Sequence, residues 1–97
     1  MKVCELLDAE SKWTQKSEAR DINQSPALFD HPAAVCWCFV GAIFCCYERD
    51  TADEVMCRVY RYLGLTDRPT VYGIVKWNDA PGRTFEEVRT VARELDI

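Results

Sequence analysis

One group of residues in this sequence has the composition of a thiol-hydrolase site. Cys38 follows His31 along the chain, and Asn78 and Asp79 come later. In such enzymes the thiol is the nucleophile, a His is the base, and an Asn or Asp orients that His. If His31 and Cys38 share one helix, roughly 10 Å separates them along its axis, whereas proton transfer needs contact at about 3 Å. We therefore expect Cys38 to fill the core and His31 to cap a surface helix. We predict no catalytic residue; Cys38, His31 and Asp79 are the candidates if that is wrong.

The chain contains six cysteines, a number that would indicate disulfides in a short secreted protein. We expect no export signal, because acidic residues lie near the start and no long apolar stretch follows. The expected compartment is the cytoplasm, where thiols stay reduced. Structural zinc sites use Cys pairs a few residues apart in loops. The spacing in Cys36-Trp37-Cys38 and Cys45-Cys46 does not fit that pattern, so we predict no metal and no cofactor.

A second candidate site is the turn segment at residues 77–84, which includes Pro81-Gly82 and is predicted to contain a type II turn. Asn78, Asp79 and Arg83 offer an amide, a carboxylate and a guanidinium close to Trp77. Such a set can recognise a polar ligand or the backbone of a partner. The same residues also suit a structural role, with side chains bonded to the turn and Arg83 paired with Asp79. Both interpretations stay open, and the structural one is favoured.

A third candidate is a basic surface around Arg58 and Arg61, with Tyr60 and Tyr62 between and beside them. Arg and Tyr are common anchors at protein interfaces, so this surface could contact a partner protein. A solvated helix face with no partner explains the same residues.

The elements that position these residues are predicted to be helices. The segment 33–47 contains no charged side chain and follows Asp30-His31-Pro32, which is typical of a helix start. It is shorter than the roughly 20 residues that span a bilayer, so we predict a helix buried inside the protein. A buried strand is the competing interpretation. Gly41 within this segment predicts the close approach of a neighbouring backbone.

Three further helices are predicted from apolar spacing and capping residues. They cover residues 3–12, 51–63 and 84–95; Thr51/Glu54 and Thr84/Glu87 form capping boxes, and Gly64 ends the second of them. Residues 13–29 are predicted to be irregular, and 71–77 is left open between a short helix and a strand. The predicted fold is all-α: a single-domain bundle, residues 1–97, of four principal helices around a buried apolar central helix.

Length and charge narrow the function classes. A chain of 97 residues is too short for a cofactor domain plus a substrate domain. A formal charge of −4, with dispersed Lys and Arg, argues against direct binding to nucleic acid. We expect no membrane association, and the sequence does not predict an oligomeric state.

Three segments, in this order, carry a resemblance to a known family. They are Trp13-Thr14-Gln15 with Ala19-Arg20-Asp21, then Ala34 to Ile43, and finally Trp77 to Thr84. The chain resembles an uncharacterised family of short proteins from bacteria and their phages, marked by Trp-Cys-x-x-Gly-Ala and Trp-Asn-Asp-x-Pro-Gly-Arg-Thr. The resemblance implies a phage or prophage setting for some members, and it implies no activity.

The function expected from the sequence is that of a small cytoplasmic interaction protein. It would bind a host protein stoichiometrically, for example as an inhibitor of host defence. One alternative is a thiol-dependent hydrolase that uses Cys38, and selective alkylation of Cys38 at neutral pH would favour it. Another is an acidic mimic of nucleic acid, which would bind its partner with a strong dependence on salt.

Overall fold

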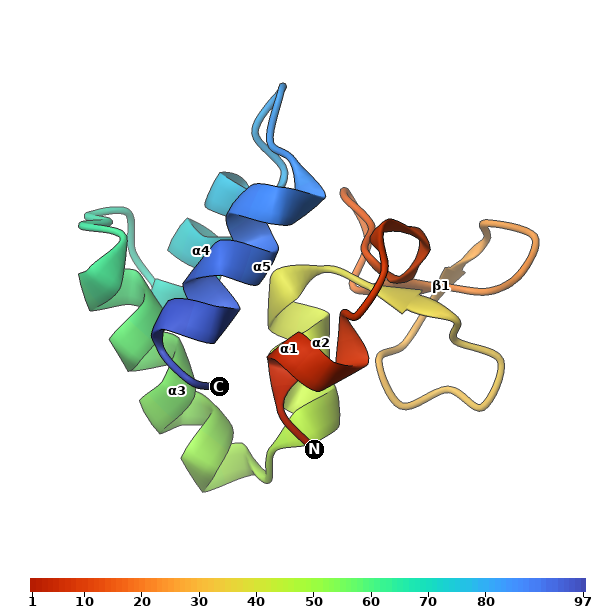
Figure 1. Cartoon of the computed structure of the whole chain (residues 1–97), viewed down its shortest axis with the longest axis horizontal. Helices are drawn as coiled ribbons and strands as arrows, with labels where there is room; N and C mark the ends of the chain where they lie inside the picture. The colour runs from red at the N-terminus through yellow and green to blue at the C-terminus, as the bar shows by residue number, and fades with distance from the viewer.

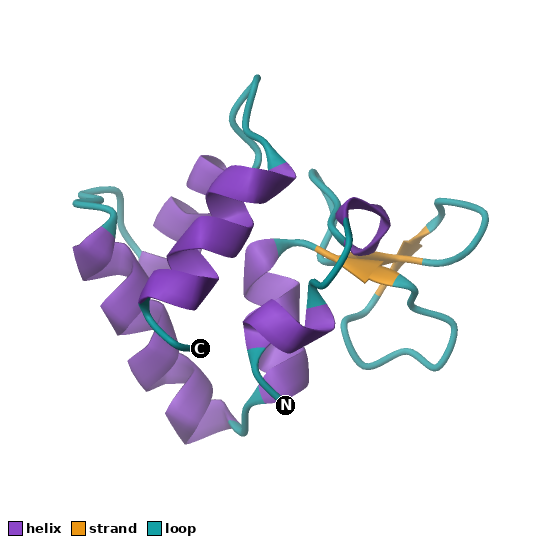
Figure 2. Cartoon of the chain, in the orientation of Figure 1, coloured by secondary structure: helices purple, strands orange, loops and turns teal.

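The computed structural model describes residues 1–97 as a helical body with a small sheet beside it (Figures 1 and 2). The order of elements along the chain is α1 (Val3–Leu6), the 3₁₀ turn η1 (Glu10–Lys12), β1 (Ala19–Arg20), β2 (Pro26–Ala27), β3 (Cys36–Trp37), α2 (Phe39–Cys46), α3 (Arg49–Tyr62), α4 (Thr70–Asn78) and α5 (Phe85–Glu94). The sheet is antiparallel, with strands in the order β2-β1-β3. No helix combines the length and apolar character needed to cross a lipid bilayer.

Helix α2 lies at the centre of the helical body and contacts α1, α3 and α4, while α5 packs against α1. Its residues from Phe39 to Ile43 are all buried. The largest fully buried apolar side chains around it come from every other helix or its flanks, and they are Val3, Leu7, Met56, Val59, Ile74, Val88 and Ile97. Burial of one such side chain is worth about 1.5–3 kcal/mol, so this shared core is what holds the helices together.

The prediction of an all-α fold is wrong, because three strands pair beside the helices. Each strand has two residues, too few for an alternating pattern to show in the sequence. The chain at Ala19 and Arg20 supplies the pairing partner that the sequence did not reveal: Val35 N–H donates to Arg20 O at 2.9 Å. The fold is therefore α+β.

The predicted central helix at 33–47 is correspondingly too long. Residues 31–34 form a turn, in which Ala34 N–H donates to His31 O, and the helix itself starts only after Cys38. The segment just before it extends along β1, where Cys38 N–H donates to Glu18 O at 3.1 Å. The apolar stretch is thus buried partly as strand and partly as helix, which periodicity cannot separate. The predicted approach of a backbone to Gly41 is confirmed, because a Cβ there would collide with the Glu18 carbonyl.

The other helices agree with the predictions to different extents. The predicted helix 3–12 ends at Leu6, and the chain continues through η1 toward β3, where Thr14 N–H donates to Trp37 O. Helix α3 begins at Arg49, two residues before the predicted capping residue Thr51, with Glu48 at its N-cap.

The predicted end of α3 at Gly64 is confirmed: Gly64 has a φ of 66°, and Leu65 N–H donates to Tyr60 O, as in a Schellman motif. The Thr84/Glu87 capping box is also confirmed. The segment left open at 71–77 is helical, since no strand lies beside it to pair with.

Candidate functional site

The segments that carried the family resemblance meet at the side chain of Asn78, which is fully buried. Its Oδ1 accepts hydrogen bonds from Trp13 Nε1 at 2.8 Å and from Phe39 N at 3.1 Å. Its Nδ2 donates to Thr14 O at 3.2 Å and to Asp79 Oδ1 at 2.9 Å. An Asn side chain has two acceptor and two donor positions, and all four are used. Asn78 is therefore a structural hub, with no position left for a ligand.

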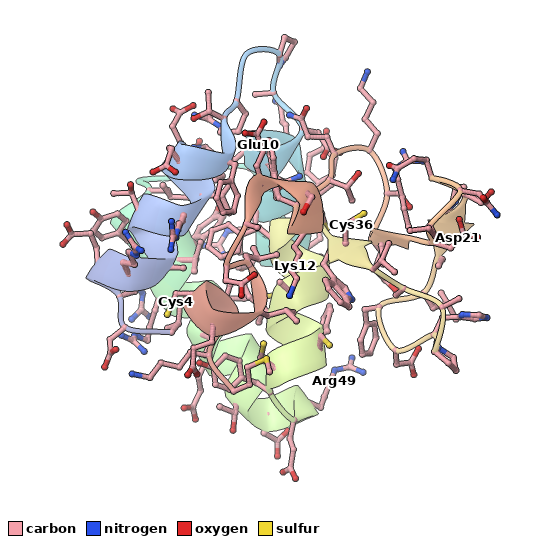
Figure 3. All side chains as sticks on the ribbon, turned by 45° about the vertical axis from the view of Figure 1, so that its right-hand side comes forward. Cys4, Glu10, Lys12, Asp21, Cys36 and Arg49 are labelled. Carbon is pink, nitrogen blue, oxygen red and sulfur yellow. The ribbon has the colours of Figure 1, made fainter.

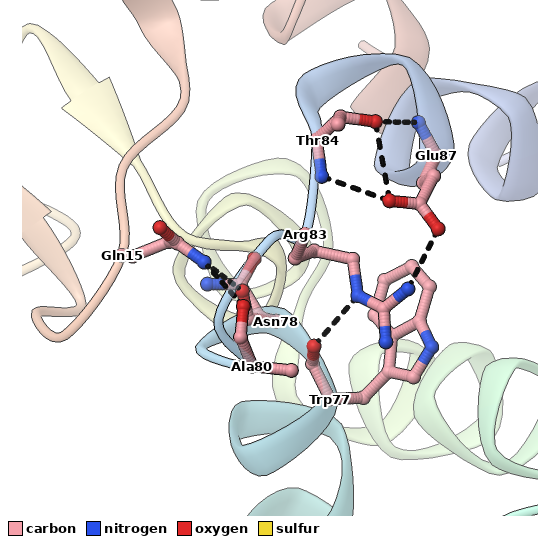
Figure 4. Close-up of polar contacts among 7 residues, drawn as sticks. All are labelled: Gln15, Trp77, Asn78, Ala80, Arg83, Thr84 and Glu87. Carbon is pink, nitrogen blue, oxygen red and sulfur yellow. Dashed lines mark hydrogen bonds and ion pairs between the residues drawn. The ribbon is translucent and has the colours of Figure 1, made fainter.

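Gln15 and Lys16, which follow Trp13 closely in the sequence, strengthen the same junction, and Figure 4 shows the contacts of Gln15. Gln15 Nε2 donates to the backbone carbonyls of Asn78 at 2.8 Å and Ala80 at 3.2 Å, at the end of α4. Lys16 N–H donates to Asp79 Oδ1 at 2.9 Å. The segment before β1 is thus fixed to the turn after α4 by bonds between residues more than sixty positions apart.

Arg83 is also engaged within the protein (Figure 4). Its guanidinium lies over the Trp77 ring at 4.0 Å from the ring centroid, and its Nε donates to Trp77 O at 2.9 Å. The expected ion pair with Asp79 is wrong: Arg83 Nη1 instead pairs with Glu87 Oε2 at 2.8 Å, since Glu87 is held close by the Thr84 cap. The turn itself fits the prediction, because Arg83 N–H donates to Ala80 O across Pro81-Gly82 and Gly82 has a φ of 82°.

Arg20 has a structural role that the sequence did not predict. From β1 it donates to Thr14 Oγ1 at 3.0 Å, Gln24 O at 2.8 Å and Gln15 O at 3.2 Å. These bonds hold the segment 13–15 beside the sheet. In the sequence, Arg20 stands out only because it lies in a segment that carries the family resemblance, and this position does not indicate a structural role.

A pocket of about 250 Å³ opens where α2, α4 and the residues before β1 meet. Its lining combines apolar side chains, of which Cys38 and Val40 are buried, with charged groups of both signs. The lining residues are Lys16, Ser17, Glu18, Cys38, Val40, Phe44, Val71, Val75 and Asp79. We call it the Cys38 pocket. Its residues come from distant parts of the chain, and for this reason only Cys38 and Asp79 were candidates from the sequence.

Cys38 caps the N-terminus of α2, where its Sγ accepts a hydrogen bond from Gly41 N at 3.3 Å. The side chain is 5% exposed. Burial raises the pKa of this thiol to about 11, and the negative charges of Asp79 and Glu18 add to the rise, although the N–H groups of Gly41 and Val40 oppose it. The thiol is therefore protonated at neutral pH, which makes it a poor nucleophile.

The structure brings Asp79 to Cys38 but leaves His31 elsewhere. His31 is exposed, its Nδ1 accepts a hydrogen bond from Ala33 N at 3.0 Å, and it does not line the Cys38 pocket. The expectation that it caps a helix is wrong, because it lies in a turn between β2 and β3. A nucleophile, a base and an orienting group are not assembled here.

A second depression, of about 340 Å³, adjoins the Cys38 pocket and shares Glu18 and Phe44 with it. Its other lining residues are Phe29, Tyr47 and Arg49. Cys36, just before α2, and Arg49, just after it, lie toward opposite ends of that helix (Figure 3). We call the two depressions together the α2 groove. It follows α2 from an end bearing Lys16 and Asp79, past the shared Glu18, to an end bearing Arg49.

The basic surface on α3 is shallower and partly used within the protein. Arg58 donates to the carbonyl of Leu95 at 2.5 Å, while Arg61 is exposed. Tyr60 is buried, and its hydroxyl donates to Asp67 O at 2.8 Å, so it is no surface anchor. Only Tyr62, which is 51% exposed, remains available beside Arg61.

Metal ligation has no obvious location in the structure. All six cysteines are free thiols. No group of three or more His, Cys, Asp or Glu side chains is arranged to hold a metal ion.

Comparison with known proteins places the chain in a family. It belongs to the family of unknown function DUF6197, whose family model matches residues 2–95. This membership agrees with the resemblance to an uncharacterised family inferred from the sequence. No curated protein and no solved structure matches the chain.

Proposed function

We propose that this is a small binding protein that recognises a partner protein through the α2 groove. The observation that supports it is the groove itself: two adjoining depressions lined by apolar and aromatic side chains and a few charged groups, a composition typical of recognition sites. Exposed apolar side chains lie at the groove or next to one of its lining residues in the sequence. Val71 is 36% exposed at the Cys38 pocket, and Leu28, next to Phe29, is 65% exposed.

The thiol-hydrolase alternative is less well supported, because its nucleophile is buried, protonated and without a neighbouring His. The acidic-mimic alternative requires a surface of one charge sign. On α3, however, Asp53 and Glu54 share a depression with Arg58 and Arg61, so the charges there are mixed.

The setting we propose is cytoplasmic, and the partner is a host protein where a family member is carried by a phage or prophage. Stoichiometric binding suits this protein, because the segments that carried the family resemblance are used to hold the fold together and offer little chemistry of their own.

Site-specific photocrosslinking tests the proposal. A benzophenone amino acid replaces Val71 in one variant, at the α2 groove, and Arg61 in a matched variant, on the α3 surface. We expect a discrete one-to-one crosslinked product in host cells from position 71 and none from position 61. A product from position 61 alone would move the interface to α3, and no product from either position would contradict the proposal.

A further inference from the structure

Two carboxylates at the Cys38 pocket are only half used by the protein. Glu18 Oε2 accepts a hydrogen bond from Phe29 N at 2.6 Å, and Asp79 Oδ1 accepts from Lys16 N and Asn78 Nδ2. The second oxygen of each group accepts no hydrogen bond from the chain, and neither group belongs to an ion pair. Each carboxylate is therefore oriented by a backbone N–H and still has an oxygen available.

The electrostatic balance inside this pocket is negative. Glu18 and Asp79 each carry one negative charge, and Lys16 is the only basic residue among the lining residues. The effect reaches the interior, because both carboxylates contribute to the raised pKa of the Cys38 thiol. A guest with a positive charge is favoured over a neutral or an anionic one.

The rest of the pocket is apolar and small. Val40, Phe44, Val71 and Val75 provide hydrocarbon surface, and the volume of about 250 Å³ is below the range of about 300–1,000 Å³ found for sites that enclose drug-sized ligands. A guest with a short hydrocarbon stem and a cationic head matches both features, since long basic side chains pack their methylenes on apolar surface while the charge stays at the rim.

We propose that the Cys38 pocket takes a lysine or arginine side chain of the partner protein, with its stem on the apolar lining and its charge between Glu18 and Asp79. This inference rests on the proposed function and names the anchor residue that the α2 groove recognises. The exposed position of Val71 beside the pocket leaves room for the partner's backbone to pass.

The proposal is tested with probes that differ only in charge. Hexylammonium and hexanol are titrated into ¹⁵N-labelled protein at low ionic strength, and the amide shifts of Phe44, Val71 and Val75 are followed. We expect hexylammonium to bind about fivefold more tightly, the preference given by one or two partly exposed charge pairs. This preference is expected to fall as salt is added. Equal affinities, or shifts confined to other parts of the protein, would overturn the proposal.

Charge-neutral variants test the assignment of the two acids. Glu18→Gln with Asp79→Asn keeps an oxygen for the backbone N–H groups, and we expect it to remove the preference for hexylammonium. If the double variant does not fold, as judged by circular dichroism, Glu18→Gln alone is expected to reduce the preference. A preference that survives in folded variants would refute the role of these carboxylates.

Two further measurements are needed. One distinguishes a side chain of a partner protein from a free amine, and the other distinguishes failure of this inference from failure of the proposed function. The blocked peptide Ac-AAKAA-NH₂ is expected to shift the same amides more than Ac-AAQAA-NH₂ does; if only hexylammonium acts, the pocket binds free amines and the docking proposal is wrong. In the crosslinking experiment, we expect the double variant to lose most of the product formed from position 71. Undiminished crosslinking would refute the lysine or arginine anchor while leaving the proposed function intact.

Discussion

Replacement of Asn78 by Ala is expected to destabilise the protein more than any exposed substitution would. The side chain is fully buried, and its loss leaves Trp13 Nε1, Phe39 N and Thr14 O without their partner. An unsatisfied buried polar group costs about 1–3 kcal/mol. Trp13 and Thr14 are partly exposed and can recruit water, whereas Phe39 is fully buried, so we estimate a total loss of about 3–4 kcal/mol. This is a large part of the roughly 5–15 kcal/mol that stabilises a typical protein.

The assay is urea unfolding followed by circular dichroism at 222 nm. With a slope of about 1.5 kcal/mol per molar urea, the midpoint of Asn78→Ala should fall by about 2–2.7 M. Trp13→Phe removes one hydrogen-bond donor to Asn78 Oδ1, while Phe39 N still donates to it. This variant should lower the free energy of unfolding by about 1 kcal/mol. Asn23→Ala, the same change at an exposed turn position, should stay within about 0.5 kcal/mol of the parent. A loss below about 1 kcal/mol for Asn78→Ala would refute its role as a hub.

Three other predictions follow from features of α2 and α5. Gly41→Ala should destabilise the protein by about 1–3 kcal/mol in urea unfolding, because the added Cβ meets the Glu18 carbonyl. This loss is expected even though Ala favours a helix over Gly by about 1 kcal/mol. An unchanged urea midpoint would contradict the close approach. Iodoacetamide at pH 7 should modify the exposed Cys57 well before Cys38, because the thiolate fraction of Cys38 is roughly 10⁻⁴ at a pKa of about 11. Equal modification rates, measured by mass spectrometry, would contradict the burial of Cys38. Thr84→Ala should cost roughly 1 kcal/mol at pH 7. The Thr84 N–H and, to a smaller extent, the Thr84 hydroxyl lower the pKa of Glu87, so this carboxylate stabilises the fold above its unfolded pKa of 4.5 and the contribution is lost as the pH falls through the lower folded value. Thr84→Ala keeps the N–H but removes the bond from the hydroxyl to Glu87, so its cost should be smaller in acid, and a cost that grows in acid would contradict the capping box.

Features set by neighbours in the chain could be predicted from the sequence. The capping box at Thr84, the end of α3 at Gly64 and the turn at Pro81-Gly82 depend on residues within a few positions of one another. Gly41 was also informative, because a helical glycine among large apolar residues indicates a backbone close by. These signals gave most of the helices but not their exact bounds.

Features that depend on distant residues were missed. The two-residue strands exist because residues 19–20 lie between 26–27 and 36–37, and no local pattern indicates that pairing. The Cys38 pocket likewise combines side chains from three separate segments, so Glu18, Phe44 and Val71 carried no signal. At the turn after α4, the sequence identified the important residues, but only the structure shows that Asn78 and Arg83 are occupied internally.

The two ends of the chain lie side by side (Figure 1). Cys4 N–H donates to Ile97 O at 3.2 Å, the Lys2 ammonium pairs with Asp96 at 2.5 Å, and Ile97 is buried. A few glycines would therefore join the ends without strain, and new ends could be opened in the exposed turn at residues 22–24, which belongs to no strand. Such a circular permutant should keep the α2 groove while its new ends lie in the loop between β1 and β2, where a reporter could be attached.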